Sequence, residues 1–528
     1  MAPLPLPSDV RFATLVCMNV SSIKEALSRP AVLFGLLILL LSYFTYFQNY
    51  AYPPQLFWDE NYHIASAQKY LNNVYFMEPH PPLAKLLIAL GEKIFHPNLA
   101  HNQFIGTDYA QNIPDGFSFV GYRFFPTLFA WLTAPVLYLI FLLLTRSPQH
   151  STLLSFLYVF DNALIVHARG AMLDSTLMIF TALTILAFLL LLETKEHSRK
   201  FFSAAALFGA AFGAAMTTKD TALILILLLP FLLWKLWPRT SDHGIKKMEK
   251  QRIAQMLGTM GLAFGIVFCG VWYTHFAIGT TVNPKLPDTG YYQASEEYKF
   301  ALDQGLTRSF GSFPTMLKDS LAFTAHYARG VPRLDLCKKD ENGSPFYFWP
   351  LGARSINFRW ETPDSNSYRY LYLQVNPVIW WVSFAAILLA IVLLVAPLFS
   401  PSREPLRHRF LLTVFVTLYI CYMIAISQLD RVMYLYHYFP PLFFSFIILG
   451  ILSMELKRFW RWDFSEQGKK TGLLILAILI FAGFQFYRPF TYYQPITDAQ
   501  FARRNIFGLW ELTCVKCEKT SSLAVPVK

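Results

Sequence analysis

AVLFGLLILLLSYFTYFQNYAYPPQLFWDE, residues 31–60, joins a long apolar run to two adjacent carboxylates. A helix needs about 20 mostly apolar residues to cross the hydrocarbon core of a bilayer, and 31–50 supplies such a run. The run lies too far from the start of the chain, and lacks the cleavage site, to be a removed signal peptide. We therefore predict a membrane-spanning helix that leads directly into a polar loop.

The composition of the whole chain indicates the same environment. Of 528 residues, 55% are hydrophobic and only 15% are charged, whereas about a quarter of the residues of soluble domains are charged. The net charge is +12, but the basic residues lie in short loops between apolar runs. This distribution is typical of an orientation signal in a membrane protein, so we predict membrane lipids and no nucleic acid as partners.

Ten further apolar runs follow the first one. The fold class that we predict is an all-α polytopic membrane protein, integral and multi-pass, with about eleven transmembrane helices. The predicted spans are 31–50, 122–144, 152–168, 171–192, 202–217, 220–237, 255–279, 377–399, 409–427, 435–455 and 472–487.

Basic residues cluster in alternate connections, among them 193–201, 238–254 and 456–471. The positive-inside rule then places residues 1–30 in the cytoplasm as an N-terminal segment. The predicted membrane domain is 31–487, with two long outer loops and an outer C-terminal tail. The outer segments are 51–121, 280–376 and 488–528.

The acidic pair Asp59 and Glu60 opens the first outer loop, directly after the first predicted span. Acids of a loop are often only solvated. A carboxylate at the membrane surface can also be a general base or can orient an acceptor, and a low dielectric there would raise its pKa. We take Asp59 and Glu60 as candidate catalytic residues, with the solvated-loop alternative open at this point.

The segment EPHPPLAKLLIALGEKIF, residues 78–95, follows in the same loop. Its prolines favour an extended chain before a short amphipathic helix, with leucines on one side. The helix is too short to span a bilayer, so we expect it to lie in the interface. His80 either forms a cap of this helix or faces a substrate.

Four basic residues lie where the positive-inside rule disfavours them, in outer turns or at an outer helix end. These are Arg123, Arg169, Lys219 and Arg431. Such residues are rare unless they are paired or functional. They could form structural ion pairs with the neighbouring acids Asp174, Asp220 and Asp430. We favour the alternative, a cationic cup that stabilises a phosphate leaving group.

Two further groups of polar residues lie near the end of the chain. Tyr434, Tyr436, His437 and Tyr438 follow Arg431, and their hydroxyl and imidazole groups suit a sugar or phosphate site as well as an interfacial belt. Cys514 and Cys517 form one CxxC, which is most simply a thiol pair or a local disulfide. No second half of a metal site accompanies it, so we predict no metal there.

Several of these segments resemble, in order, the protein O-mannosyltransferase family. FWDENYHIASAQKYLNNVYFMEPHPPLAKLL (57–87) is similar to its first outer loop, and DNALIVHARGAMLDSTLMIF (161–180) to its DN…R…LDS segment. Three later landmarks of the family are matched by PFYFWPL (345–351), NPVIWW (376–381) and YHYFP (436–440). Each motif alone is weak, but five in the same order are specific.

The resemblance implies a GT-C glycosyltransferase bundle whose two outer loops contain short helices. It implies a polyprenyl-phosphate-linked sugar donor and inverting transfer, most simply of mannose, to Ser or Thr hydroxyls of exported proteins at the outer membrane face. Asp59 would be the base, with Glu60 beside it, and Arg123 would help to hold the donor phosphate. Arg169, Asp174, His437 and Tyr438 also match positions of the family near the site. No cofactor is implied, and a divalent metal is neither required nor ruled out.

The chain departs from the eukaryotic pattern of that family in its second long loop. Residues 280–376 are too few for the MIR domain, which implies a compact bacterial-type member in an inner (plasma) membrane, with its site facing the periplasm or exterior. The acceptor stays open between a protein and a lipid or glycan, as in aminoarabinose transferases. A lipid transporter without chemistry is a third hypothesis, but it predicts internal repeats that the sequence lacks.

Overall fold

The computed structural model describes residues 29–194, 198–238, 243–283, 290–338, 341–400, 405–456, 458–459 and 462–515. Nearly all of the predicted N-terminal segment 1–30 lies outside these ranges, and so does Cys517.

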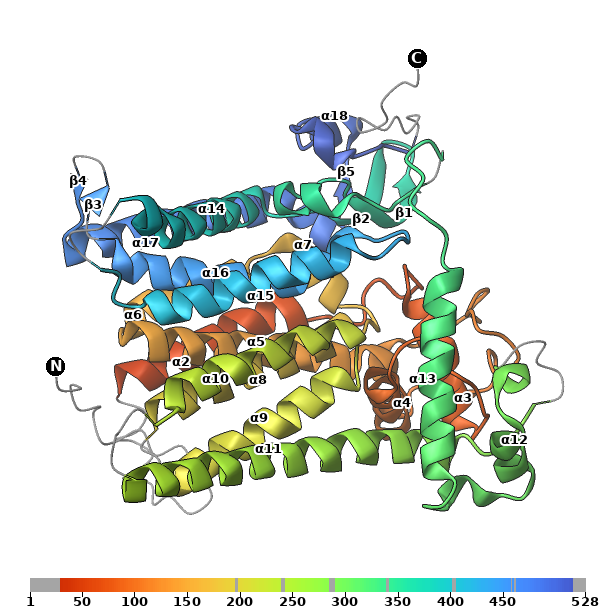
Figure 1. Cartoon of the computed structure of the whole chain (residues 1–528). Helices are drawn as coiled ribbons and strands as arrows, with labels where there is room; N and C mark the ends of the chain where they lie inside the picture. Colours follow the sequence, from red (N-terminus) through yellow and green to blue (C-terminus); the bar gives the residue numbers. More distant parts are fainter. Residues whose placement is uncertain are drawn as a thin grey trace.

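Each predicted span coincides with a helix of one bundle (Figure 1). The π-helical turn η2 (Tyr43–Phe47) continues the first helix, and the 3₁₀ segments η3 (Asp220–Leu227) and η7 (Leu435–Tyr438) lead into α10 and α16. The bundle helices are α2 (Pro30–Ser42), α5 (Val120–Thr145), α6 (Pro148–Val159), α7 (Asn162–Ala168), α8 (Asp174–Glu193), α9 (Arg199–Met216), α10 (Leu228–Leu236), α11 (His243–Ile278), α14 (Pro377–Phe399), α15 (Arg409–Ser427), α16 (Phe439–Glu455) and α17 (Glu466–Thr491).

Not every one of these helices is long and apolar enough to cross a bilayer alone. Among the described residues, eight helices are, and α6 with α7, bent by 62°, makes a ninth if the pair is one span. The other two predicted spans, α9 and η3 with α10, pack on α8 inside the same bundle. The predicted count of eleven therefore corresponds to eleven helical segments, of which eight or nine meet the criterion of length and composition.

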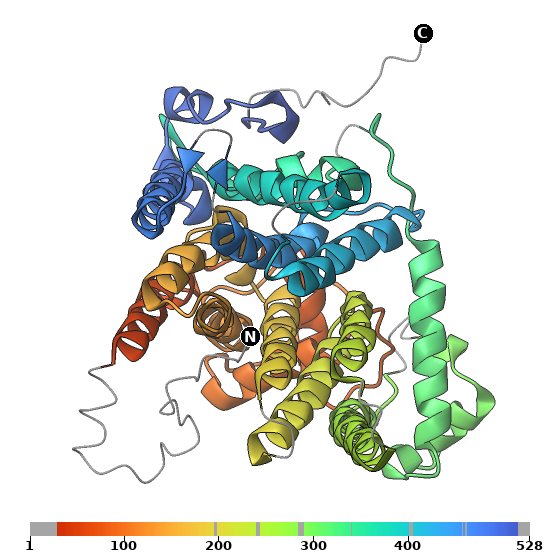
Figure 2. The same cartoon turned by 60° about the vertical axis from the view of Figure 1, so that its left-hand side comes forward.

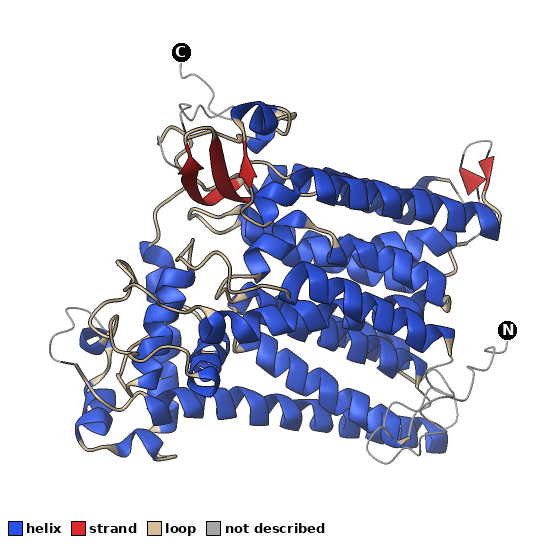
Figure 3. Ribbon diagram, turned by 180° about the vertical axis from the view of Figure 1, so that it is seen from behind, coloured by secondary structure: helices blue, strands red, loops and turns tan. Residues whose placement is uncertain are grey.

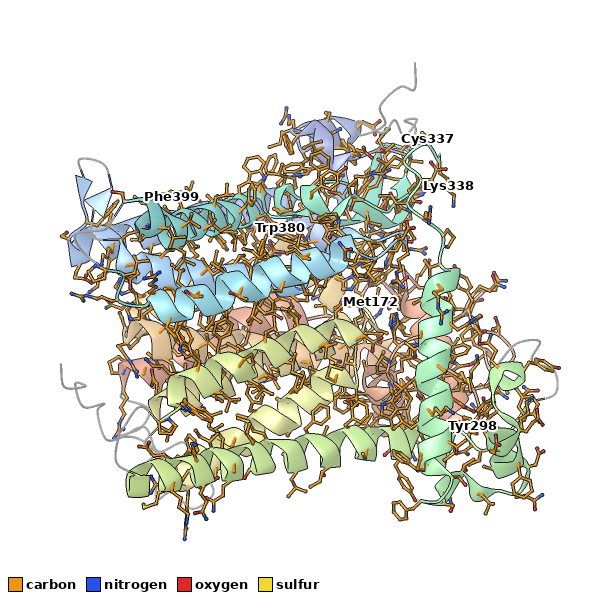
Figure 4. All side chains as sticks on the ribbon, viewed as in Figure 1. Met172, Tyr298, Cys337, Lys338, Trp380 and Phe399 are labelled. Carbon is orange, nitrogen blue, oxygen red and sulfur yellow. The ribbon has the colours of Figure 1, made fainter. Side chains whose placement is uncertain are left out.

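The described parts of both long loops and of the C-terminal tail gather at one end of the bundle, which we call the loop end (Figures 1 and 3). Four short helices lie there: α3 (Glu60–Leu71), α4 (Leu83–Phe95), α12 (Glu296–Asp303) and α13 (Phe313–Gly330). Helix α13 runs across the ends of the bundle helices, as the turned view also shows (Figure 2). In Figure 4, Tyr298 marks α12 at the loop end and Phe399 marks the opposite end of α14.

Helix α4 is the amphipathic segment predicted in the interface. Its buried side contains Lys85, which forms an ion pair with Glu78, and Glu92, which accepts a hydrogen bond from Asn98. Leu90 and Ile94 of the predicted apolar stripe are instead exposed. An exposed apolar stripe backed by a buried polar side is what a helix needs when one side faces lipid.

A small sheet at the loop end was not predicted. Strands β1 (Ile356–Asp364) and β2 (Ser367–Leu373) form an antiparallel hairpin, and β5 (Pro495–Ile496) pairs with β2. Along β2 the side chains Tyr370 to Leu373 are all buried, and the rings of Tyr370 and Tyr372 pack against Phe490 of α17 and Phe501 of the tail. A second pair of short strands, β3 (Arg458–Phe459) and β4 (Trp462–Asp463), lies at the opposite end of the bundle (Figure 1).

The tail after α17 belongs to this folded cap. Trp510 is fully buried, and its indole N–H donates to the carbonyl of Leu351. Arg354 donates to Glu511 across 2.8 Å and to two loop carbonyls, and both charged groups are buried. Cys514 is disulfide-bonded, and the second cysteine of the CxxC lies outside the described residues. The cap therefore holds the described tail up to residue 515, beyond the predicted end of the membrane domain at 487.

We expect Glu511→Ala to loosen the sheet, because it leaves the Arg354 guanidinium buried without its carboxylate. Breaking a buried ion pair typically costs about 3–5 kcal/mol. Hydrogen–deuterium exchange of residues 356–373 would then be faster by several orders of magnitude. Glu296→Ala, which removes an exposed pair with Lys299, should leave this exchange unchanged. Equal protection in both variants would contradict the role of the buried pair.

Candidate active site

A buried ion pair shapes the loop that leads into the site. Arg123 donates to Glu60 through Nη2 at 2.6 Å and through Nε at 3.0 Å. The Glu60 carboxylate also accepts the backbone N–H groups of Phe57 at 3.0 Å and Ala171 at 3.1 Å. Glu60 thus joins the first loop, α5 and the turn between α7 and α8, the turn that contains Met172 in Figure 4.

The remaining donors of Arg123 are used by the same loop. They bond to the carbonyl oxygens of Ala51, Pro53 and Gln55 at 2.6–2.8 Å, and the guanidinium lies 4.8 Å from the centre of the Phe57 ring. The side chain is completely buried. In this structure Arg123 and Glu60 therefore position the loop, and neither has a free surface for a donor phosphate or an acceptor.

Asp59 occupies the N-cap position of α3, but its side chain makes no capping bond. Instead, Tyr436 donates its hydroxyl to Asp59 Oδ2 at 3.0 Å. The preceding residue, Trp58, has a φ of 52°, a strained conformation for a non-glycine residue. The backbone is therefore held so that the carboxylate points at η7 rather than at its own helix.

Burial raises the pKa of Asp59 above its usual range, and the hydrogen bond from Tyr436 opposes part of this rise. The nearby cations, including Lys219, oppose it as well. A carboxylate with a raised pKa, held by a single hydrogen bond, can accept a proton from a hydroxyl group that approaches it.

Tyr436 is the centre of an aromatic stack. Its ring lies 4.7 Å from that of His167 and 4.6 Å from that of His437, with interplanar angles of 22° and 24°. Lys219 Nζ lies 5.5 Å from the centre of the Tyr436 ring, and the ring of Tyr434 stacks on the Tyr436 ring at a centroid distance of 5.6 Å. This stack fixes the hydroxyl that contacts Asp59.

Asp174 forms a second charged group beside this stack. One oxygen lies 2.8 Å from His167 Nε2, and the other accepts from Lys219 Nζ at 2.7 Å. The basic partner of Asp174 is therefore Lys219. The ion pair with Arg169, which was one alternative in the sequence analysis, is not formed. One carboxylate thus holds an imidazole and an ammonium group together beside the stack.

Arg431 and His80 complete the site. Arg431 Nε is buried and has no hydrogen-bond partner among the described residues. Its neighbour Asp430 pairs with Arg333 at the surface instead. Burial and the cations Lys219, Lys85 and Arg431 keep the pKa of His80 well below its usual range. His80 is therefore neutral at neutral pH and keeps one N–H to donate.

Two of the predicted residues lie elsewhere. Arg169 turns away from Asp59 and donates to carbonyl oxygens in and just after η2, including those of Gln48 at 2.9 Å and Asn49 at 2.6 Å. The Tyr438 hydroxyl contacts that of Tyr419 at 2.9 Å inside the bundle. The structure thus brings together Asp59, His80, Asp174, Arg431 and His437, and it leaves Arg169 and Tyr438 outside this group.

His167 is a residue of this site that the sequence did not single out. Lys219 was a member of the predicted cationic cup, and Tyr436 was part of a tyrosine-rich run that suits a sugar or phosphate site. Lys219 precedes a segment that begins with Asp220, which suggested a local pair and concealed its bond to Asp174. His167 lies seven residues before Asp174 across a turn, a spacing that gave no signal without the bend between α7 and α8.

The described residues contain no group of three or more His, Cys, Asp or Glu side chains that could hold a metal ion. Lys219 and Arg431 are the cationic side chains of this site.

Comparison with known proteins identifies the class. The fold matches a structure of the S. cerevisiae protein O-mannosyltransferase Pmt1-Pmt2 complex bound to the sugar donor, with a TM-score of 0.78 over 95% of both chains and 15% identity. At this identity the likeness shows the fold, which is that of a GT-C glycosyltransferase.

Two family models match the sequence along most of its length. Residues 36–283 match the dolichyl-phosphate-mannose-protein mannosyltransferase model, and residues 325–510 match the C-terminal four-transmembrane region of protein O-mannosyltransferases. The chain belongs to the protein O-mannosyltransferase family, whose members are membrane glycosyltransferases with several spans.

Two curated relatives illustrate the distance within the family. Protein O-mannosyltransferase 1 of Drosophila melanogaster is 28% identical over 49% of this chain and 29% of its own length. Protein O-mannosyl-transferase 1 of Danio rerio is 26% identical over 65% of this chain and 45% of its own length. The chain thus spans less than half the length of these relatives.

We expect Tyr436→Phe to raise the pKa of Asp59 further, because the variant removes the hydroxyl that stabilises the ionised carboxylate. Infrared spectroscopy measures this change, because the carboxyl stretch of Asp59 can be followed as the pH is varied. The Asp59→Asn variant serves as the blank. Tyr438→Phe, on the same segment but bonded to Tyr419, should leave the titration unchanged. A shift in both variants, or in neither, would contradict the assigned hydrogen bond.

Proposed function

We propose that the protein transfers mannose from a polyprenyl-phosphate carrier to Ser or Thr hydroxyls of exported proteins, with inversion at the anomeric carbon. The observation that supports this most directly is the placement of the Asp59 carboxylate at the loop end, where it accepts a hydrogen bond from Tyr436 and lies near the Lys219 ammonium group. Membership of the family adds the donor and acceptor classes. The S. cerevisiae Pmt1-Pmt2 complex, whose fold this chain shares, is bound to the sugar donor.

The chemistry is a single displacement. Asp59 accepts the proton of the acceptor hydroxyl while the oxygen forms a bond to the anomeric carbon. The bond from this carbon to the phosphate oxygen breaks at the same time, and the polyprenyl phosphate leaves with the electron pair. Because the attacking oxygen and the leaving oxygen lie on opposite faces of the sugar, the configuration inverts.

The leaving phosphate requires positive charge as the bond breaks. Arg431 is the group best suited to supply it, since its Nε is buried without a partner. Lys219 adds a second charge, partly balanced by Asp174, and the neutral ring of His80 can donate a hydrogen bond. Arg123, which the resemblance places at the phosphate, would act through the loop that it holds.

We place this site at the outer face of the membrane, because basic residues concentrate in the connections at the other end of the bundle. We also propose that the protein resides in a bacterial plasma membrane. The support for this location is the short second loop, which has no room for a MIR domain. The curated relatives named above are eukaryotic, so this part rests on the loop alone.

A lipid or glycan acceptor is the alternative within the same chemistry, since neither Asp59 nor the cations select an acceptor. Parallel assays with a labelled polyprenyl-phosphate mannose donor, a Ser/Thr-rich peptide and a lipid acceptor separate the two. Transfer to the lipid alone would overturn the protein acceptor and keep the site.

We expect Asp59→Asn to reduce transfer by at least about a hundredfold, the usual contribution of a general base. Donor binding should persist, because the amide keeps the shape of the side chain. Labelled-donor transfer and donor binding would be measured on the same preparation. Asp303→Asn, an exposed acid at the end of α12, serves as the control. Full activity of the Asp59→Asn variant would contradict the proposal that Asp59 is the general base.

We expect Arg431→Gln to weaken donor binding by about tenfold or more, the loss of one charge-assisted hydrogen bond to phosphate. Arg431→Lys should recover part of this binding. Arg333→Gln, which removes the surface partner of Asp430, should bind the donor normally. The affinity of each variant for the donor is measured by titration. A normal affinity of Arg431→Gln would show that Arg431 does not bind the phosphate.

A further inference from the structure

A second site lies at the loop end, away from Asp59. A cavity of about 650 Å³ opens between the first helix and the last one of the bundle. Residues of α2 and η2 line one side, residues of α17 and the following turn line the other, and Phe160 lies between them. Helices α2 and α17 both pack on α6, so α6 forms the floor of a groove.

Three arginines line this cavity, and none of its lining residues is acidic: they are Arg169, Arg369 and Arg488. The guanidinium groups of Arg169 and Arg488 lie 5.0 Å and 5.8 Å from the centre of one ring, that of Tyr492. Two like charges around a single ring favour an anion between or beside them.

Two of these arginines have unused donors. Arg369 donates to Glu361 through Nη1 at 2.7 Å, but its Nε is buried and has no hydrogen-bond partner among the described residues. Arg488 is exposed and forms no ion pair in the described part of the chain. Arg169 is different, because its terminal nitrogens bond to backbone carbonyls, so it contributes charge.

The walls of the groove are apolar and face outward. Phe44 on η2 and Phe481 on α17 both line the cavity, and they are 51% and 44% exposed. Farther from the loop end, each helix continues as an exposed apolar stripe, which includes Leu37 and Leu40 on α2 and Ile478 and Leu474 on α17. The cationic cavity therefore lies at headgroup depth, at the top of two separate faces that contact lipid chains.

We infer that this cavity binds the phosphate headgroup of an anionic two-chain phospholipid of the surrounding bilayer. Arg369 and Arg488 donate to the phosphate, and Arg169 adds positive charge beside it. One acyl chain lies along each of the exposed faces of α2 and α17. A cation next to an anionic lipid surface typically strengthens binding about fivefold. The cavity shares no lining residue with the group around Asp59, so this site is separate from that of the proposed donor.

The test uses the full chain in phosphatidylcholine vesicles without any sugar donor, so it does not depend on the proposed transfer. Electron paramagnetic resonance of spin-labelled phosphatidylglycerol and phosphatidylcholine gives the preference of the protein for the anionic lipid. We expect this preference to fall about fivefold in Arg488→Gln and further in Arg369→Gln/Arg488→Gln. Arg503→Gln is the matched control, since Arg503 is exposed at the loop end but does not line the cavity.

An unchanged preference in Arg488→Gln and in the double variant would overturn the site. An equal loss in Arg503→Gln would overturn it as well, because the effect would then be one of overall charge. Two competitors test the occupant. Displacement of the labelled lipid by millimolar inorganic phosphate, or by polyprenyl phosphate at a lower mole fraction than by phosphatidylglycerol, would overturn the two-chain phospholipid.

Discussion

The buried bond between Glu60 and Arg123 is the interaction on which the site depends. A carboxylate and a guanidinium out of water are costly unless their remaining donors and acceptors are paired. Here Glu60 accepts from two backbone N–H groups and Arg123 donates to three carbonyls. The pair therefore fixes loop 51–60 against α5 and the α7–α8 turn. Asp59 precedes Glu60 directly in this loop, so its position is fixed as well.

The same reasoning explains why the site is assembled from distant parts of the chain. Asp59, Asp174 and Tyr436 come from the first loop, α8 and η7, and each is bonded to a residue of another segment. Tyr436 joins these bonds, because its ring contacts His167 and Lys219 while its hydroxyl contacts Asp59. Displacement of one helix would thus change the charge around the proposed base.

The sequence predicted the helices and the candidate carboxylate well, and the direction of side chains poorly. Apolar length is a property of each segment alone, so all the predicted spans coincide with helices. Whether Arg169 points to Asp59 or to the carbonyls in and just after η2 depends on the 62° bend after α6, which no local pattern encodes. The hairpin of β1 and β2 was missed because burial on both faces of β2 hides the alternation by which strands are recognised.

The four basic residues that violate the positive-inside rule show what decides the role of a cation at a membrane surface. Arg123 has every donor satisfied inside the protein, and it is structural. Arg169 is satisfied by carbonyls but lines a cavity that faces lipid. Lys219 is bonded to one carboxylate, that of Asp174. Arg431 keeps a buried N–H that has no hydrogen-bond partner among the described residues. The number of acceptors that the fold supplies to each cation, rather than its position in the sequence, therefore determines which ones are left to bind a phosphate.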